Sequence, residues 1–203
     1  MRKVFITGIG TDVGKTVVSA IVTEALQADY WKPIQTGSYL SCDADIVKSL
    51  ISNSKTKIHP EIYKLEQPLS PHAAAELENV KLSLSEIEIP KTDNTLVIEG
   101  AGGIMVPLND HEFILDLIKK FDAETILVIQ NYLGSINHSL LSIDCLKLHN
   151  IKILGIIFNG PSHKMSEDII IKYSKLPILA HIEKESKITP AVISKYAAQL
   201  KNI

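Results

Sequence analysis

The densest group of residues that could do chemistry lies near the N-terminus, in Gly8-Ile9-Gly10-Thr11-Asp12-Val13-Gly14-Lys15-Thr16. Glycines let backbone N–H groups turn toward a phosphate, and the start of a helix adds partial positive charge. Lys15 would neutralise the β- and γ-phosphates, and the Thr16 hydroxyl would reach Mg²⁺. Five residues separate Gly8 from Gly14, whereas the common spacing is four. The pattern predicts a variant phosphate loop that binds a nucleoside triphosphate with Mg²⁺.

Three charged side chains farther along the chain could extend this site. Lys32, within Trp31-Lys32-Pro33-Ile34-Gln35-Thr36-Gly37, could face a substrate anion at a strand end, or could be a solvated lysine before a turn. Asp43 could bind Mg²⁺ or cap a helix, and Asp45 is the rival metal ligand. Glu99 ends an apolar strand before a glycine-rich loop, where P-loop proteins place a second acidic group near the metal.

Weaker signals come from three turns. Ser70-Pro71-His72 could be an ordered substrate loop or a rigid turn. The segment Gly134-Ser135-Ile136-Asn137-His138 reads as a strand-to-helix turn in which Asn137 could simply cap the helix. Asn159-Gly160 follows a strand where a nucleotide base could be read, but it is also an ordinary turn pair. The seven histidines show no metal-binding spacing, so a zinc site is not expected.

Alternation of two kinds of segment indicates the fold that must position these residues. Short apolar runs without alternation predict strands covered on both faces, and apolar residues at helical spacing predict helices between them. The expected strands are 4–6, 96–98, 126–129, 153–158 and 178–179, and the expected helices are 17–27, 43–51, 112–121, 137–149, 166–173 and 190–200. This order predicts one α/β domain over residues 1–203, with a mostly parallel sheet and helices on both faces. Residues 52–93, which hold four prolines, are expected to form a long and less regular connection.

Composition narrows the class of protein further. The chain has 203 residues, 45% of them apolar and 22% charged, with a net charge of −2, so no broad nucleic-acid or membrane surface is expected. The two cysteines form no CxxC and are expected to be ordinary free thiols. No apolar stretch reaches the roughly 18 residues of a membrane span, and the apolar run at the N-terminus is too short to be expected as a signal peptide. These features predict a cytoplasmic protein without nucleic-acid or membrane partners.

The order of these clusters resembles the dethiobiotin synthetase family, whose phosphate loop also has the five-residue spacing. The resemblance covers residues 7 to about 160. It rests on Thr7-Gly8 to Thr16, Trp31-Lys32-Pro33, Thr36-Gly37-Ser38, Asp43-Ala44, Ser70-Pro71-His72, Val97-Ile98-Glu99-Gly100-Ala101-Gly102-Gly103, Leu133-Gly134, Ile136-Asn137-His138 and Asn159.

This resemblance implies a homodimeric, Mg²⁺-dependent P-loop enzyme of biotin synthesis that uses 7,8-diaminononanoate, CO₂ or bicarbonate, and ATP. One amine would form a carbamate, ATP would phosphorylate it to a carbamic–phosphoric anhydride, and the second amine would close a cyclic urea. The products would be dethiobiotin, ADP and phosphate. The fold implied is that of P-loop nucleotide hydrolases.

The resemblance also implies roles for individual residues. Catalysis would involve Thr11, Asp12, Lys15 and Lys32, and the metal would be held by Thr16, Asp43 and Glu99. The nucleotide would contact Asp12, Val13, Gly14, Lys15, Thr16, Val17, Glu99, Gly100, Ala101, Gly102, Asn159 and Gly160. The substrate would contact Thr36 and Pro71, and the partner subunit would hold its carboxylate with Gly134, Ser135, Ile136 and Asn137.

Two positions depart from the family pattern, and two other protein classes compete. Asp12 stands where family members can have glutamate, and Tyr132 stands where a lysine is expected. A partitioning-type nucleotide-switch ATPase usually has an extra lysine where this chain has Gly10. An amide-forming synthetase of corrinoid synthesis usually adds a glutaminase domain, for which 203 residues leave no room. The switch ATPase should hydrolyse ATP without a diamine, whereas the synthetase should need it.

Overall fold

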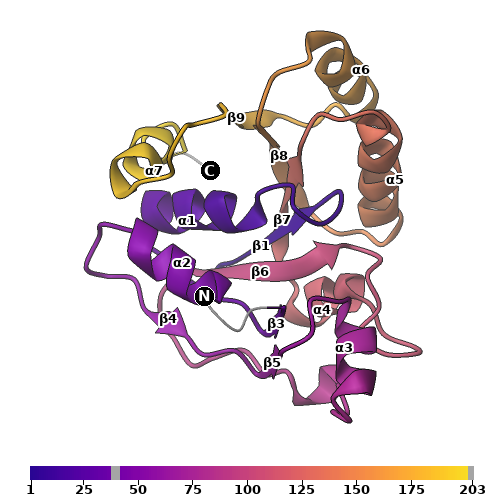
Figure 1. The fold of residues 1–203 in the computed structure, drawn as a ribbon. Coiled ribbons are helices and arrows are strands. Elements are labelled where there is room, and N and C mark those ends of the chain that lie inside the picture. The colour runs from indigo at the N-terminus through magenta and orange to yellow at the C-terminus, as the bar shows by residue number, and fades with distance from the viewer. Residues whose placement is uncertain (38–41, 201–203) are drawn as a thin grey trace.

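The five apolar runs of the sequence form five neighbouring strands of a parallel sheet (Figure 1). The computed structural model describes residues 1–37 and 42–200. Within them a seven-stranded sheet has the order β4-β2-β6-β1-β7-β8-β9, and every pairing of neighbours in it is parallel. Its strands are β1 (Lys3–Gly8), β2 (Asp29–Trp31), β4 (Ile58–His59), β6 (Leu96–Gly103), β7 (Glu124–Ile129), β8 (Ile153–Asn159) and β9 (Ile178–Ile182).

Helices cover both faces of this sheet, as predicted. Helices α1, α2 and α7 pack against one another over one face, and α4 packs against β6 in the second hydrophobic cluster. Helices α5 and α6 pack together beside β7, β8 and β9. Their bounds are α1 (Lys15–Leu26), α2 (Asp43–Leu50), α3 (Pro71–Leu77), α4 (Ile114–Phe121), α5 (Ser135–Leu148), α6 (Lys164–Ser174) and α7 (Pro190–Ala197). The six predicted helices all occur, with starts that differ by up to two residues.

Residues 52–93 are more ordered than the sequence indicated. They contain β4, β5 (Tyr63–Leu65), α3 and the 3₁₀ helix η1 (Leu84–Glu86). Strand β5 pairs in parallel with β3 (Ile34–Thr36) in a separate two-stranded sheet. Strands of two or three residues are too short to give an apolar pattern, so only their long-range pairing defines them.

Two capping roles considered from the sequence are wrong. Cys42 is the N-cap of α2, and Asp43 is the first residue of the helix, with its carboxylate turned to other partners. Gly134 is the N-cap of α5, so Asn137 lies inside the first turn. Helix capping therefore does not account for either side chain, and each can have a role in a binding site.

A buried carboxylate, that of Asp29, links β2 to residues in and before its two neighbouring strands. Asp29, in β2, accepts hydrogen bonds from the backbone N–H of Lys57 at 3.0 Å and from the Thr92 hydroxyl at 2.8 Å. His59 Nε2 lies 3.0 Å from the same carboxylate, and the Asn94 amide donates to it at 3.2 Å. Asp29 thereby joins β2 to the segments before β4 and β6, which sets the position of the strand that leads to Lys32.

The two cysteines, Cys42 and Cys145, are free thiols, as predicted. Among the described residues, no helix is both long and apolar enough to cross a membrane.

Candidate active site

The predicted phosphate loop joins β1 to α1 in the expected place. Gly14 has φ +90°, a conformation that side chains with a Cβ rarely adopt. A Cβ there would also lie 2.1 Å from Nδ2 of Asn159, which donates a hydrogen bond to the carbonyl of Val13 at 2.9 Å. The end of β8 therefore holds the loop, and only glycine fits at position 14.

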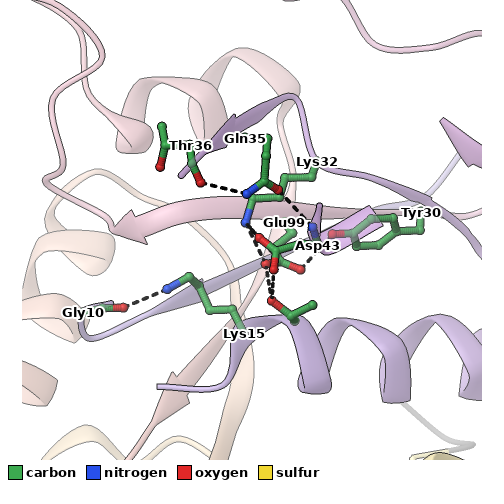
Figure 2. Close-up of polar contacts among 9 residues, drawn as sticks. Gly10, Lys15, Tyr30, Lys32, Gln35, Thr36, Asp43 and Glu99 are labelled. Carbon is green, nitrogen blue, oxygen red and sulfur yellow. Dashed lines mark hydrogen bonds and ion pairs between the residues drawn. The ribbon is translucent and has the colours of Figure 1, made fainter. Parts of the chain in front are cut away.

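Lys15 projects from the first turn of α1 into the site. Its Nζ donates to the carbonyl of Gly10 across the loop at 2.8 Å, a contact that Figure 2 shows. Burial lowers the pKa of Lys15 to about 8, because the attraction of Glu99 and Asp43 offsets only part of the lost hydration. An ammonium held this way is ready to exchange a backbone carbonyl for a phosphate oxygen.

A second lysine lies between two carboxylates (Figure 2). Nζ of Lys32 donates to Oε1 of Glu99 at 3.0 Å and to Oδ2 of Asp43. The Thr16 hydroxyl lies 2.8 Å from Oδ1 of Asp43 and 3.0 Å from Oε1 of Glu99. Burial alone would lower the pKa of Lys32, but the charges of Glu99 and Asp43 outweigh it and raise that pKa. Lys32 is therefore a firmly charged ammonium.

Tyr30 adds a buried hydrogen-bond donor to this cluster. Its fully buried hydroxyl donates to Oε2 of Glu99 at 2.9 Å. Burial, and then the charge of Glu99, raises the pKa of Tyr30 well above its ordinary value, so the phenol stays a donor. Glu99 itself is 1% exposed, and its two oxygens are thus oriented by Tyr30, Lys32 and Thr16.

The donor set suits Mg²⁺. The Thr16 hydroxyl and the carboxylates of Asp43 and Glu99 are hard oxygen ligands, and Mg²⁺ commonly takes one or two carboxylates together with phosphate oxygens and water. No group of three or more His, Cys, Asp or Glu side chains arranged for a metal occurs in the described residues. Asp45, the rival ligand, is exposed and is not among the residues that line the cleft beside this cluster.

These groups line one cleft of about 920 Å³. Most of the predicted site residues meet there, together with Gln35 and the apolar side chains of Pro68, Leu69 and Val106. The predicted residues in its lining are Thr11, Asp12, Gly14, Lys15, Thr16, Val17, Lys32, Thr36, Asp43, Pro71, Glu99, Ala101 and Gly102.

Thr36 enters the cleft from β3, and Gln35 helps to place it. The Gln35 amide donates to the backbone carbonyl of Thr36 at 2.9 Å and accepts from the backbone N–H of Asp43 at 3.1 Å. Gly37 has φ +70°, and a Cβ there would lie 2.6 Å from Cα of Pro68, so Pro68, in the segment that leads to Ser70 and Pro71, packs closely on this turn. Ser38, which belongs to the Thr36-Gly37-Ser38 motif, lies outside the described residues.

Several predicted residues lie outside the cleft lining. Val13 and Asn159 support the phosphate loop through their mutual hydrogen bond, and Gly100 packs against the ring of Phe5. Gly160 donates its backbone N–H to the carbonyl of Ile182. The predicted carboxylate-binding residues are at the start of α5, away from the cleft of the same chain; they are Gly134, Ser135, Ile136 and Asn137.

Sequence reasoning missed Tyr30 and Gln35. Tyr30 is two residues before Lys32, so strand alternation could have placed both side chains on one face. Gln35 lies inside the fragment that carries Lys32 and Thr36, but its role depends on a contact with the backbone of α2.

The parallel sheet, the phosphate loop between β1 and α1, and the lysine–carboxylate cluster define a P-loop nucleotide-binding protein. A family model described as an AAA domain matches residues 2–192. The chain is 52% identical to the ATP-dependent dethiobiotin synthetase of Cytophaga hutchinsonii, over 98% of this chain and 97% of that protein. It is 51% identical to the ATP-dependent dethiobiotin synthetase of Christiangramia forsetii, over 98% of this chain and 96% of that one.

The chain therefore belongs to the ATP-dependent dethiobiotin synthetase family, and the prediction of an ATP-dependent ligase is confirmed. Among solved structures, it is similar to the septum site-determining protein MinD of Pyrococcus horikoshii complexed with Mg-ADP. The TM-score is 0.60 with 15% identity, over 99% of this chain and 96% of that one. That likeness concerns the fold and supports the predicted P-loop architecture.

Proposed function

We propose that the chain closes the cyclic urea of dethiobiotin from 7,8-diaminononanoate, CO₂ and ATP, with release of ADP and phosphate. Family membership supports the overall reaction, and one observation supports the chemistry. Lys32, which is paired with two carboxylates, and Lys15, which donates only to a backbone carbonyl, line a single cleft. The Thr16 hydroxyl, the carboxylates of Asp43 and Glu99, and Thr36 line the same cleft. Such a set can bind a nucleotide phosphate chain and a small anion side by side.

The first step forms a carbamate: the lone pair of one substrate amine attacks the carbon of CO₂, one carbon–oxygen π bond opens to an oxyanion, and the nitrogen loses a proton. Thr36 and Lys32 line the same cleft, where the Thr36 hydroxyl would donate to the carbamate and the Lys32 ammonium would attract its charge. A carbamate is a poor electrophile, because its charge is spread over two oxygens, so it needs a better leaving group before a second amine can attack.

Phosphoryl transfer supplies that leaving group. A carbamate oxygen attacks the γ-phosphorus, the bond to the bridging oxygen breaks, and ADP leaves. Lys15 and Lys32 would stabilise the negative charge on the transferred oxygens, and Thr11 and Asp12, which line the same cleft, would face the reacting centre. Mg²⁺ held by Thr16, Asp43 and Glu99 would supply further charge neutralisation at the phosphates.

Ring closure completes the reaction. The lone pair of the second amine attacks the carbonyl carbon of the mixed anhydride, the carbon–oxygen bond to the phosphate breaks, and the amine loses a proton. The products are the cyclic urea and inorganic phosphate. For the nucleotide itself, we propose contacts with the phosphate loop from Val13 to Val17, with Gly100 to Gly102, and with Asn159 and Gly160 near the base.

We further propose that the enzyme is a homodimer in which Gly134, Ser135, Ile136 and Asn137 bind the substrate carboxylate for the partner's cleft. These residues begin α5, where free backbone N–H groups favour an anion. The exposed side chains Leu141 and Leu148 and the partly buried Cys145 form a stripe on the same helix, and Cys145 contacts Met105. An apolar stripe of this kind fits a subunit interface.

Residues 1–203 are proposed to act as one domain in the cytoplasm. The sheet that carries the cleft also carries both hydrophobic clusters, which supports one folding unit. Two free thiols and the use of ATP support a reducing, ATP-containing compartment.

The experiment that tests the proposal measures ADP release with ATP, Mg²⁺ and bicarbonate, with and without 7,8-diaminononanoate. We expect ADP release to require the diamine and the product mass to be that of dethiobiotin. ADP release that ignores the diamine would remove this assignment and favour a nucleotide-switch ATPase, the class that the MinD-like fold also accommodates.

A further inference from the structure

The ion pairs around Lys32 involve the same oxygens that would bind the metal. Glu99 offers Oε1 to both the Lys32 ammonium and the Thr16 hydroxyl, each at 3.0 Å. Asp43 offers one oxygen to Thr16 and the other to Lys32. The ammonium therefore lies where the two carboxylates converge, which Figure 2 shows.

Two carboxylates at this depth need a cation. Glu99 is 1% exposed and Asp43 is only partly exposed, so their mutual repulsion is weakly screened by water. Lys32 supplies one positive charge in this position, with its own side chain 7% exposed. Mg²⁺ would supply two charges to the same oxygens, and both cations cannot bind them fully at once.

We propose that Lys32 is a resident cation of the metal site: its ammonium holds Asp43 and Glu99 when no divalent ion is bound, competes with the ion, and is released into the cleft by it. This inference rests on the proposed metal role of Asp43 and Glu99. A lysine suits the exchange, because its four-carbon stem lets Nζ move by several ångströms while the backbone stays in place.

The released ammonium still faces the reacting groups. Lys32 lines the same cleft as Lys15 and Thr36, so a rotation of its stem keeps Nζ among the groups that would bind phosphate and carbamate. Metal loading would then deliver the Lys32 charge to the transferred phosphoryl group. Without the metal, the Lys32 ammonium stays paired with Asp43 and Glu99 and is not available to the transferred phosphoryl group.

If Lys32 competes with a divalent ion for Asp43 and Glu99, removing the lysine should strengthen binding of the ion. In Lys32→Met the stem length is kept, but Asp43 and Glu99 lose their counter-ion. We expect Mn²⁺, measured by electron paramagnetic resonance without nucleotide, to bind at least about tenfold more tightly than to the wild type. The melting temperature of Lys32→Met should also rise with Mn²⁺ far more than that of the wild type. A merely structural lysine would give weaker binding instead.

Lys15→Met is the matched control. It also removes one buried ammonium from the cleft, but that ammonium donates to the carbonyl of Gly10 instead of a carboxylate. Mn²⁺ binding should tighten clearly less in this variant. Equal gains in the two variants would show a general charge effect and overturn the proposal, as would unchanged or weaker binding by Lys32→Met.

If Lys32→Met is unfolded without metal, refolding on addition of Mn²⁺ supports the proposal, and failure to refold overturns it. No diamine is used in these experiments. Diamine-dependent ADP release by the wild type therefore tests the proposed reaction separately, and either idea can fail while the other stands.

Discussion

The two lysines of the cleft differ in their electrostatic surroundings. Lys15 has a neutral hydrogen-bond partner, so burial dominates and lowers its pKa to about 8. Lys32 has two anionic partners, which raise its pKa despite burial. Over the physiological pH range Lys32 stays charged, whereas the charge of Lys15 can change with pH.

Nucleotide affinity should therefore depend on pH. Phosphate binds the charged form of Lys15, so the affinity for ADP should be constant well below pH 8 and fall above it, by up to about tenfold per pH unit. Calorimetry in two buffers of different ionisation enthalpy should detect proton uptake on ADP binding near pH 8 to 9.

Lys15→Met is the control for this titration. It should bind ADP weakly at every pH, turn over at least about a hundredfold more slowly, and lose the proton uptake. A wild-type affinity that stays flat from pH 7 to 9.5 would contradict a role for Lys15 in phosphate binding.

Glu99→Gln tests the metal site. The amide is nearly the same size, so the contact with Tyr30 can persist, but one of the two carboxylate charges is lost. The Mg²⁺ concentration that gives half-maximal turnover should rise about tenfold or more. An unchanged Mg²⁺ titration would remove Glu99 from the metal site.

At the scale of elements, the sequence predicts the parts of the fold that have a strong local pattern. The continuous apolar run at 96–98, followed by Glu99 and a glycine-rich loop, indicates β6, and Gly14-Lys15-Thr16 marks the start of α1. Strands β3 and β5 have three residues each and exist through pairing across about thirty residues of sequence, which no local pattern records. Tyr30 and Gln35 reach the site for the same reason, since their roles come from contacts with Glu99 and α2.

The junction between the phosphate loop and β8 gives an element-scale prediction. Gly14→Ala places a Cβ against the Asn159 amide at a φ that alanine rarely adopts. The loop must shift, so ADP affinity should fall by about a hundredfold or more while the far-ultraviolet circular dichroism stays that of the wild type. Gly10→Ala is the control, because a Cβ there meets open space. Equal effects of both substitutions would argue against a loop held by Asn159.

The Asp29 network gives a stability prediction. Burial alone would raise the pKa of Asp29, but hydrogen bonds from Lys57, Thr92, His59 and Asn94 outweigh it and lower that pKa. A lowered folded-state pKa stabilises the fold above the unfolded value of about 3.8, and this stabilisation is lost as pH falls through the folded-state pKa. Asp29→Asn should lower the free energy of unfolding at pH 7 by about 1–3 kcal/mol.

Urea denaturation between pH 7 and 3 measures this effect. The difference between wild type and Asp29→Asn should be largest near pH 7 and shrink below pH 4. Asp93→Asn removes the same charge from an exposed position nearby and should change the urea midpoint little. A gap that is the same at every pH would show that the network does not depend on an ionised Asp29.

At the scale of the whole molecule, the cleft and the start of α5 lie apart in one chain. The cleft, which we propose binds phosphate-bearing and carbamate groups, is lined by residues of the phosphate loop and β6, whereas α5 follows β7 (Figure 1). A substrate with a carboxylate at its far end needs a second anion site, which the proposed partner subunit would supply. The proposed enzyme is therefore incomplete as a monomer even though each chain has its own phosphate loop.

Sedimentation should accordingly show a mass of twice the 22.4 kDa of one chain. Leu141→Glu puts a charge into the exposed stripe of α5, where Leu141 is 61% exposed, and should give a monomer. That monomer should keep wild-type ADP affinity, because the phosphate loop is within one chain, but lose diamine-dependent turnover. Leu77→Glu, at a 64% exposed leucine of α3, should leave both mass and turnover unchanged. A Leu141→Glu monomer with full turnover would mean that one chain binds the whole substrate, and a persistent dimer would place the interface elsewhere.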